Sequence, residues 1–304
     1  MSGKATKYHE SEILDISLRK QQVQPIPDMV YAQKPTLDFK NVLLQMNIWR
    51  PRDLTNLPAV IFITGGGFIA ANRARLPQLR MRLAENGYFV GSISYRVAPE
   101  VMFPAPLEDV KSAIRYVKAH AGELNVDPER VAVVGDSAGG YLSAFAGITS
   151  GSTEFDEGEH LHVSSSVKAA VTLYGLSDLS KVAEDYSDEM KRWTNSAAGI
   201  SSLLVNGVPV FGGRDGGIEA NTEYMEKANP INYINEKSAP MLLFHGGKDA
   251  LISPSQTDIL YQALRNRGIE AKRYVVPKAE HAGPYWIQDE VLDIIQAFLD
   301  KHMK

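Results

Sequence analysis

The chain has 304 residues and contains no cysteine. This absence excludes disulfide bonds, thiolate catalysis and cysteine-ligated metal sites, and it is compatible with a reducing cytosol. Long apolar runs are lacking too, because no run approaches the roughly 18 residues of a membrane-spanning helix. The polar N-terminal residues lack the apolar core of a signal peptide. The sequence therefore predicts a cytoplasmic protein with no membrane partner.

A strong charge of one sign is also absent. Charged residues make up 22% of the chain and the formal net charge is −4, and no basic stripe indicates a nucleic-acid partner. Apolar residues make up 44%, which is enough to bury the core of a single α/β domain. We therefore expect a small-molecule partner, and the composition is compatible with a homo-oligomer.

Short apolar runs and helical patterns alternate along most of the chain. Residues 1–40 carry scattered charge and three prolines, so we expect an N-terminal arm there. The runs interpreted as buried strands are 60–63, 89–93, 131–134, 169–174, 241–244 and 274–276. Helical stripes cover 110–117, 259–264 and 287–298. This alternation over 41–304 predicts an α/β fold with a mostly parallel central sheet and helices on both faces.

Residues 176–238 interrupt this rhythm, because they show no clean helix or strand period. We interpret this segment as a cap insertion over the carboxyl edge of the sheet. Trp193 and Phe211, together with Phe68 after the glycine loop, are candidate walls of a substrate pocket. Tyr186 and Tyr224 are further aromatic candidates in the insertion.

The sequence around Ser137 gives the strongest local signal. Gly135, Ser137 and Gly139 form G-x-S-x-G, preceded by a buried apolar run and followed by a helix-compatible run. A serine at such a tight strand-to-helix turn sits in strained backbone, and side chains at the two glycine positions would collide across the turn. The following helix directs its free N–H groups at the reaction centre. Ser137 is therefore the predicted nucleophile.

Three glycines, residues 65–67, follow the first core run. Ester hydrolysis passes through an oxyanion that needs fixed N–H donors. A glycine-rich loop supplies such donors because its backbone can come close to the substrate. The N–H of Ala138, directly after the serine, is the other predicted donor.

The base and the acid are chosen by their place in the chain. Of seven histidines, His281 lies between the last strand and the last helix, where this fold places its base; His245 is its rival. Asp249 follows the strand before it and would orient the imidazole, with Asp178 as the competing acid. Asp136 should point away from Ser137 in a structural role.

These residues together resemble the hormone-sensitive-lipase-like branch of the α/β hydrolases, including bacterial feruloyl-esterase-like proteins. The resemblance runs from about residue 42 to the end and includes the segments 95–100, 103–109 and 135–140. It implies that the N–H groups of Gly66, Gly67 and Ala138 form the oxyanion hole. Thr64 stands where the family usually has histidine before the glycines. Because the donors are backbone groups, this departure concerns how the loop is held.

The residues predict a serine carboxylesterase that hydrolyses short-chain esters through an acyl-enzyme, without metal or organic cofactor. One alternative is a feruloyl or acetyl esterase acting on plant-derived or carbohydrate esters. Another is an arylformamidase or amidase on the same fold. A non-catalytic ligand-binding protein is the third alternative, since fold does not fix function.

Overall fold

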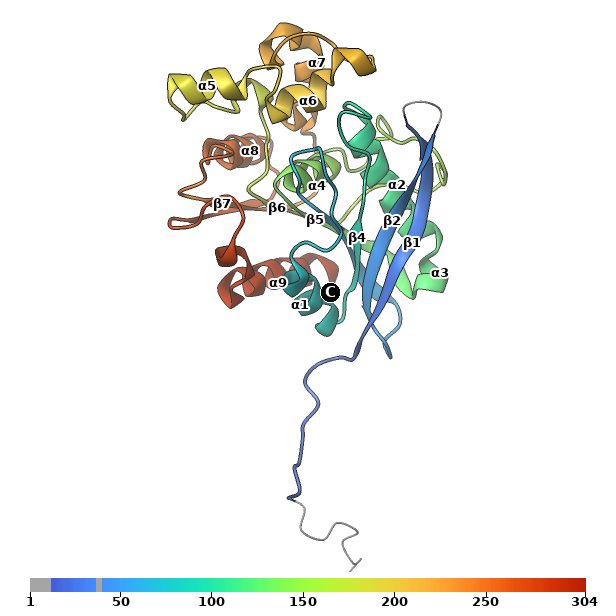
Figure 1. The fold of residues 1–304 in the computed structure, drawn as a ribbon. Coiled ribbons are helices and arrows are strands. Elements are labelled where there is room, and N and C mark those ends of the chain that lie inside the picture. The colour runs from blue at the N-terminus through green and yellow to red at the C-terminus, as the bar shows by residue number, and fades with distance from the viewer. Residues whose placement is uncertain (1–11, 37–39) are drawn as a thin grey trace, which may run out of the picture.

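A computed structural model describes residues 12–36 and 40–304, and an eight-stranded sheet forms the centre of this part of the chain (Figure 1). The strand order is β1-β2-β4-β3-β5-β6-β7-β8. β2 is antiparallel to both of its neighbours, and the other pairs are parallel. The strands are β1 (Val23–Pro35), β2 (Asn41–Pro51), β3 (Leu57–Ile63), β4 (Phe89–Ile93), β5 (Val126–Asp136), β6 (Ala170–Leu173), β7 (Met241–Gly246) and β8 (Ala271–Val276). The predicted mostly parallel sheet is confirmed.

Helices cover both faces of the sheet, as predicted. α1 and α9 lie on one face and α2, α4 and α8 on the other (Figure 1). The helices are α1 (Pro77–Glu85), α2 (Ala105–Ala119), α3 (Ala121–Leu124), α4 (Ala138–Ile148), α5 (Asp188–Thr194), α6 (Ile200–Asn206), α7 (Thr222–Lys227), α8 (Ser255–Asn266) and α9 (Asp289–Met303). Short 3-10 helices are η2 (Leu179–Lys181), η3 (Pro209–Phe211), η4 (Ile218–Asn221), η5 (Pro230–Tyr233) and η6 (Pro284–Ile287). Within the described ranges, none of the helices has the length and apolar character needed to cross a bilayer.

The expected N-terminal arm needs a correction. β1, which was expected to belong to the arm, is an edge strand of the sheet and pairs with β2 along its length. Tyr31 is buried, and its hydroxyl donates to Ser94 O at 2.6 Å. The prolines that suggested an arm are tolerated because an edge strand leaves some N–H groups unpaired. Residues 12–22 carry no helix or strand, and the rest of the expected arm, 1–11 and 37–39, lies outside the described residues.

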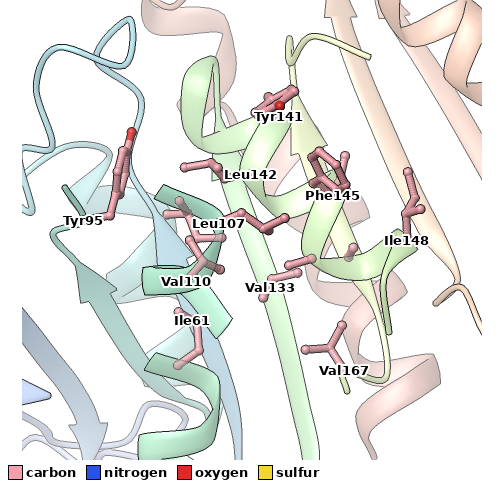
Figure 2. Packing of buried hydrophobic residues seen from close by; sticks show 14 of the residues in the cluster. Ile61, Tyr95, Leu107, Val110, Val133, Tyr141, Leu142, Phe145, Ile148 and Val167 are labelled. Atoms are coloured by element: carbon pink, nitrogen blue, oxygen red, sulfur yellow. The ribbon is translucent and has the colours of Figure 1, made fainter. Parts of the chain in front are cut away.

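The core consists of two layers of apolar side chains, one on each face of the sheet. Ile61 and Val133 point to the α2 and α4 side, where they pack with Val110 and Phe145 (Figure 2). Phe62, the next residue along β3, belongs to the layer beneath α1 and α9. Both faces of the central strands are therefore buried, which explains why these strands are continuous apolar runs rather than alternating ones.

The insertion connects β6 to β7 and contains α5, α6 and α7, which lie together at one end of the molecule (Figure 1). Its first residues are fixed by Gln256, a fully buried side chain at the start of α8. The amide oxygen of Gln256 accepts from the N–H groups of Ser177 and Asp178 at 2.8 and 3.0 Å. Its amide nitrogen donates to Asp178 O and Lys181 O, both at 3.0 Å. The amide thus links the root of the insertion to α8.

A substitution at Gly139 tests how closely α4 packs on β3. A Cβ atom at this position would lie 2.0 Å from Ile63 O, a backbone atom that cannot rotate away. We expect Gly139→Ala to lower the free energy of unfolding by about 3 kcal/mol or more, since overpacking a rigid contact is destabilising. Urea unfolding followed by circular dichroism measures this change.

Gly122→Ala is the matched control, because nothing lies within 4 Å of a Cβ at this helical position. We expect it to leave the stability unchanged or to raise it by up to about 1 kcal/mol. Equal stability of the two variants would contradict the close approach of α4 to the sheet.

Candidate active site

Four loops that follow parallel strands meet at the carboxyl edge of the sheet. The glycine loop 65–67 follows β3, Ser137 follows β5, Asp249 follows β7 and His281 follows β8. The crevice at the carboxyl ends of the strands is where open α/β sheets bind their ligands. The fold therefore brings together residues that are far apart in the sequence.

Ser137 occupies a strained turn between β5 and α4. Its φ of 55° and ψ of −122° lie in a region that non-glycine residues rarely adopt. The turn is held because Ser137 N donates to Leu173 O at 2.8 Å on the neighbouring strand. A Cβ at Gly135 would lie 2.1 Å from Gly139 O across the turn. The predicted collision across the turn is confirmed at Gly135, whereas a Cβ at Gly139 would collide with Ile63 O of β3 at 2.0 Å.

His281 connects Ser137 to Asp249. Its Nε2 lies 2.8 Å from Ser137 Oγ, and its Nδ1 lies 2.8 Å from Asp249 Oδ2. The imidazole also packs edge-on against the ring of Tyr174, with a centroid distance of 4.8 Å. The structure thus joins the three side chains selected from the sequence into one hydrogen-bonded chain.

The carboxylate of Asp249 is surrounded by donors. Its Oδ1 accepts from the N–H groups of Leu251 and Ile252, both at 2.9 Å. Burial by itself would raise the pKa of Asp249, but the hydrogen bonds from His245, His281 and Ile252 hold this pKa below its ordinary value. The carboxylate therefore stays charged at neutral pH, and a charged acceptor keeps the proton of His281 on Nδ1.

The two rivals lie elsewhere. Asp178 caps the short helix η2, where its Oδ1 accepts from Ser180 N at 3.1 Å and its Oδ2 lies 3.6 Å from Lys181 Nζ. His245 is fully buried behind Asp249 rather than beside Ser137. Asp178 therefore does not replace Asp249 as the partner of His281, and His245 does not replace His281 as the partner of Ser137.

Asp136 holds the glycine loop in place. Its buried carboxylate accepts from Gly65 N at 2.8 Å and pairs with Arg75 Nη2 at 3.0 Å. The hydroxyl of Tyr95 donates to Thr64 O at 2.8 Å, whereas Thr64 Oγ1 has no hydrogen-bond partner among the described residues. The loop is thus held through its backbone, which explains how it tolerates Thr64 where the family usually has histidine. The sequence did not reveal the role of Arg75, because no motif surrounds it.

Free N–H groups lie next to Ser137. Ala138 is the first residue of α4, so its N–H has no acceptor within the helix. In the part of the chain that the structure describes, the N–H groups of Gly66 and Gly67 also donate to no acceptor. Gly67 and Ala138 line the same cavity as Ser137. Such free donors are the groups that stabilise a developing oxyanion.

A cavity of about 50 Å³ opens beside Ser137. Phe68 and Trp193 line it as expected, but the expectation for Phe211 is corrected, because Phe211 is half-exposed in η3 and does not line the cavity. Tyr224 lies in a separate hollow, where the Arg214 guanidinium stacks 3.3 Å from its ring centroid.

The full lining of the cavity beside Ser137 is Gly67, Phe68, Ser137, Ala138, Leu176, Val182, Trp193, Thr194, Ile200, Ser201, Leu251 and Ile252. Most of the cavity-lining residues in the insertion could not be predicted from the sequence, because a segment without periodicity does not reveal which side chains face inward.

Residues suited to a metal do not gather at this site. Over residues 12–36 and 40–304, no three His, Asp or Glu side chains are grouped so that they could hold a metal ion. The polar groups of the site are instead paired with one another or with backbone N–H groups.

A family model described as BD-FAE matches residues 46–264. The matched span includes the glycine loop, Ser137 and Asp249. The chain belongs to the BD-FAE family. The match ends before His281, so the histidine is assigned from the geometry of this chain.

Relatives of this BD-FAE protein carry esterase names. Esterase LipQ of Mycobacterium tuberculosis is 28% identical over 78% of this chain and 53% of its own length. The probable carboxylic ester hydrolase LipM of the same organism is 31% identical over 78% of this chain and 52% of its own length. The chain thus spans about half the length of the curated relatives it matches.

Solved structures give the same fold. A truncated form of a carbohydrate esterase from gut microbiota superposes with a TM-score of 0.78 at 25% identity, covering 92% of this chain and 96% of the other. An acetyl ester-xyloside bifunctional hydrolase from Caldicellulosiruptor lactoaceticus has a TM-score of 0.69 at 23% identity, covering 86% and 88%. The fold is that of the α/β hydrolases.

The lowered pKa of Asp249 predicts a pH-dependent stability. A carboxyl group whose pKa is lower in the folded state stabilises the fold above its unfolded value of about 3.9, and this contribution is lost as the pH falls below that value. We therefore expect the difference in unfolding free energy between wild type and Asp249→Asn to be largest near neutral pH and to shrink below about pH 4. Urea unfolding of both proteins across this range measures the difference. A difference that does not vary with pH would contradict the lowered pKa.

Proposed function

We propose that the chain is a serine carboxylesterase with Ser137 as nucleophile, His281 as general base and Asp249 as the residue that orients the base. The observation that carries the proposal is the position of His281, whose two ring nitrogens lie 2.8 Å from Ser137 Oγ and 2.8 Å from Asp249 Oδ2. This is the geometry that nucleophilic acyl transfer requires.

In the first half of the reaction, His281 Nε2 takes the proton of Ser137 as Oγ attacks the ester carbonyl. The imidazolium that forms is stabilised by the charged Asp249. The carbonyl oxygen becomes an oxyanion, which the free N–H groups of Gly66, Gly67 and Ala138 stabilise. When the intermediate collapses, His281 returns the proton to the leaving alcohol and the acyl group remains on Ser137.

In the second half, His281 takes a proton from a water molecule, which attacks the acyl-enzyme. The same N–H groups stabilise the second oxyanion. Collapse then releases the carboxylic acid and returns the proton to Ser137 Oγ. Groups of the chain itself carry each of these steps, so the mechanism uses no metal or organic cofactor.

The names of the relatives support this proposal. LipQ and LipM are named as an esterase and a carboxylic ester hydrolase, and the superposed gut structure as a carbohydrate esterase. Because the match covers only about half of each curated relative's own length, the site geometry carries more weight than their names. A small ester is the substrate under this proposal, and a cytoplasmic location stays a prediction from the sequence.

The cavity favours small acyl groups. The cavity beside Ser137 is small, at about 50 Å³, and its lining is mostly apolar. It therefore suits short acyl groups, from acetyl to butyryl, better than an aromatic acyl group such as feruloyl. Trp193 is 52% exposed at the cavity and offers an apolar ring to the alcohol part of the ester. An acetyl ester of a carbohydrate is therefore the second candidate substrate.

A fluorophosphonate probe tests the nucleophile. We expect it to label wild type at Ser137 and to leave Ser137→Ala unlabelled, and we expect this variant to lose ester hydrolysis by about a millionfold. Intact-mass and peptide mass spectrometry with a nitrophenyl ester assay measure both effects. Asp178→Asn is the matched control and should retain turnover within about tenfold, because its carboxylate only caps η2. A folded Ser137→Ala protein with more than about one percent of the activity would rule out this nucleophile.

A series of nitrophenyl esters tests the acyl pocket. Each methylene that fits contributes about 0.8 kcal/mol, so kcat/KM should rise from acetyl to butyryl and fall at octanoyl, where the chain exceeds the cavity. Rates that continue to rise through dodecanoyl, with activation at an oil–water interface, would contradict the small pocket.

A further inference from the structure

His245 is a buried histidine that the proposed mechanism does not use. It is the penultimate residue of β7 and is fully buried. Its Nε2 lies 3.0 Å from Ile252 O and 3.3 Å from Asp249 Oδ2. Its Nδ1 lies 3.1 Å from Thr257 Oγ1 on α8. Both ring nitrogens therefore have partners, and one partner is the carboxylate that orients His281.

The partners of both ring nitrogens indicate which nitrogen of His245 carries the proton. Arg273 Nε on β8 donates to Thr257 Oγ1 at 3.1 Å, and a guanidinium can only donate. The single hydroxyl hydrogen of Thr257 has two acceptors within reach, His245 Nδ1 at 3.1 Å and Pro254 O at 3.4 Å, and Nδ1 is the nearer. Because Nδ1 accepts a hydrogen bond, the proton of the neutral ring lies on Nε2.

The Nε2–H group faces two acceptors and no donor. It donates to Ile252 O at 3.0 Å, and Oδ2 of Asp249, the same carboxylate oxygen that His281 Nδ1 contacts at 2.8 Å, lies 3.3 Å from Nε2. The other oxygen, Oδ1, already accepts two backbone N–H groups. His245 thus places a polarised N–H group within 3.3 Å of the carboxylate oxygen that His281 contacts.

We propose that His245 is a positioning residue, which acts on the reaction at Ser137 through Asp249 and His281. This inference rests on the proposed esterase function. The neutral Nε2–H of His245 holds Oδ2 in line with His281 Nδ1, and it disperses part of the negative charge on that oxygen. Thr257, which accepts from Arg273 Nε, contacts His245 Nδ1 at 3.1 Å and holds the ring in this position.

The expected effect of losing the His245 Nε2–H group on the pH profile has a definite sign. Without the Nε2–H donor, more negative charge stays on Asp249 Oδ2, which favours protonated His281 and moves the acid limb of the kcat/KM profile to higher pH. The other charged groups near His245 are Arg273 with its partner Asp258 at 3.3 Å, and Asp185, which contacts Ser253 after the Asp249 loop. None of these groups is changed by a substitution at His245, so the shift reports on the Asp249 contact.

Kinetics of two variants test the inference. His245→Phe keeps a ring of similar size and removes both nitrogens, whereas the side-chain amide of His245→Gln can still donate to Asp249. We expect His245→Phe to lower kcat by about 10- to 100-fold with little change in KM, and to raise the midpoint of the acid limb by about half a pH unit to one unit. His245→Gln should restore kcat to within about threefold of wild type. A residue that only filled space would change thermal stability without moving the acid limb.

A second measurement does not depend on hydrolysis or on the stability of His245→Phe. Nitrogen-15 NMR of histidine-labelled wild type should show His245 as the Nε2–H tautomer. Thr257→Val removes the hydrogen-bond donor to Nδ1, so the ring is no longer held beside Asp249 and the acid limb should shift, whereas Thr257→Ser, which keeps the hydroxyl, should retain the wild-type acid limb.

The outcomes separate this inference from the proposed function. A wild type that reacts with a fluorophosphonate but shows no change of acid limb in His245→Phe or Thr257→Val would overturn the role of His245 alone. An Nδ1–H or doubly protonated His245 would do the same. A wild type that neither reacts with the probe nor hydrolyses esters would overturn the esterase proposal and, with it, this role.

Discussion

The close contact between α4 and the carboxyl end of β3 is the constraint on which the candidate site depends. The backbone at Gly139 approaches Ile63 O so closely that even a Cβ would lie 2.0 Å from it. This approach places the N-terminus of α4 beside the glycine loop that continues from β3. The strained conformation of Ser137 is the local cost of the tight turn, and the surrounding strands supply the hydrogen bonds that hold it.

Two buried carboxylates then position the loops around Ser137. Asp136 holds the glycine loop through Gly65 N and Arg75, and Asp249 holds the imidazole of His281. A buried charge is costly unless it is paired and hydrogen-bonded, and both carboxylates meet this condition. The charges also make the site rigid, because each carboxylate fixes several groups at once. The imidazole and the free N–H groups are therefore held in fixed positions, which the proposed stabilisation of an oxyanion requires.

The sequence predicted those parts of the molecule that obey strict local rules. Buried parallel strands must be apolar on both faces, so the core runs identified β3 to β8. The elbow requires Gly135 and Gly139 for steric reasons, which made Ser137 recognisable, and chain order then selected His281. The edge strand β1 was mistaken for an arm, because its solvent-facing residues and prolines look like those of a loop. Arg75 and Gln256 could not be found, because their roles come from contacts across the fold that leave no pattern in the sequence.

The same reasoning explains why the cavity beside Ser137 is the least predictable part of the candidate site. The hydrogen-bonded groups stand on loops at the ends of the strands, whose positions are set by the core. Trp193 and Ile200, in contrast, come from the insertion, which has no helix or strand period of its own. Gln256 attaches the first residues of this insertion to α8, so the root of the cavity wall is fixed. Changes in acyl specificity can therefore arise in the insertion without disturbing the geometry of Ser137, His281 and Asp249.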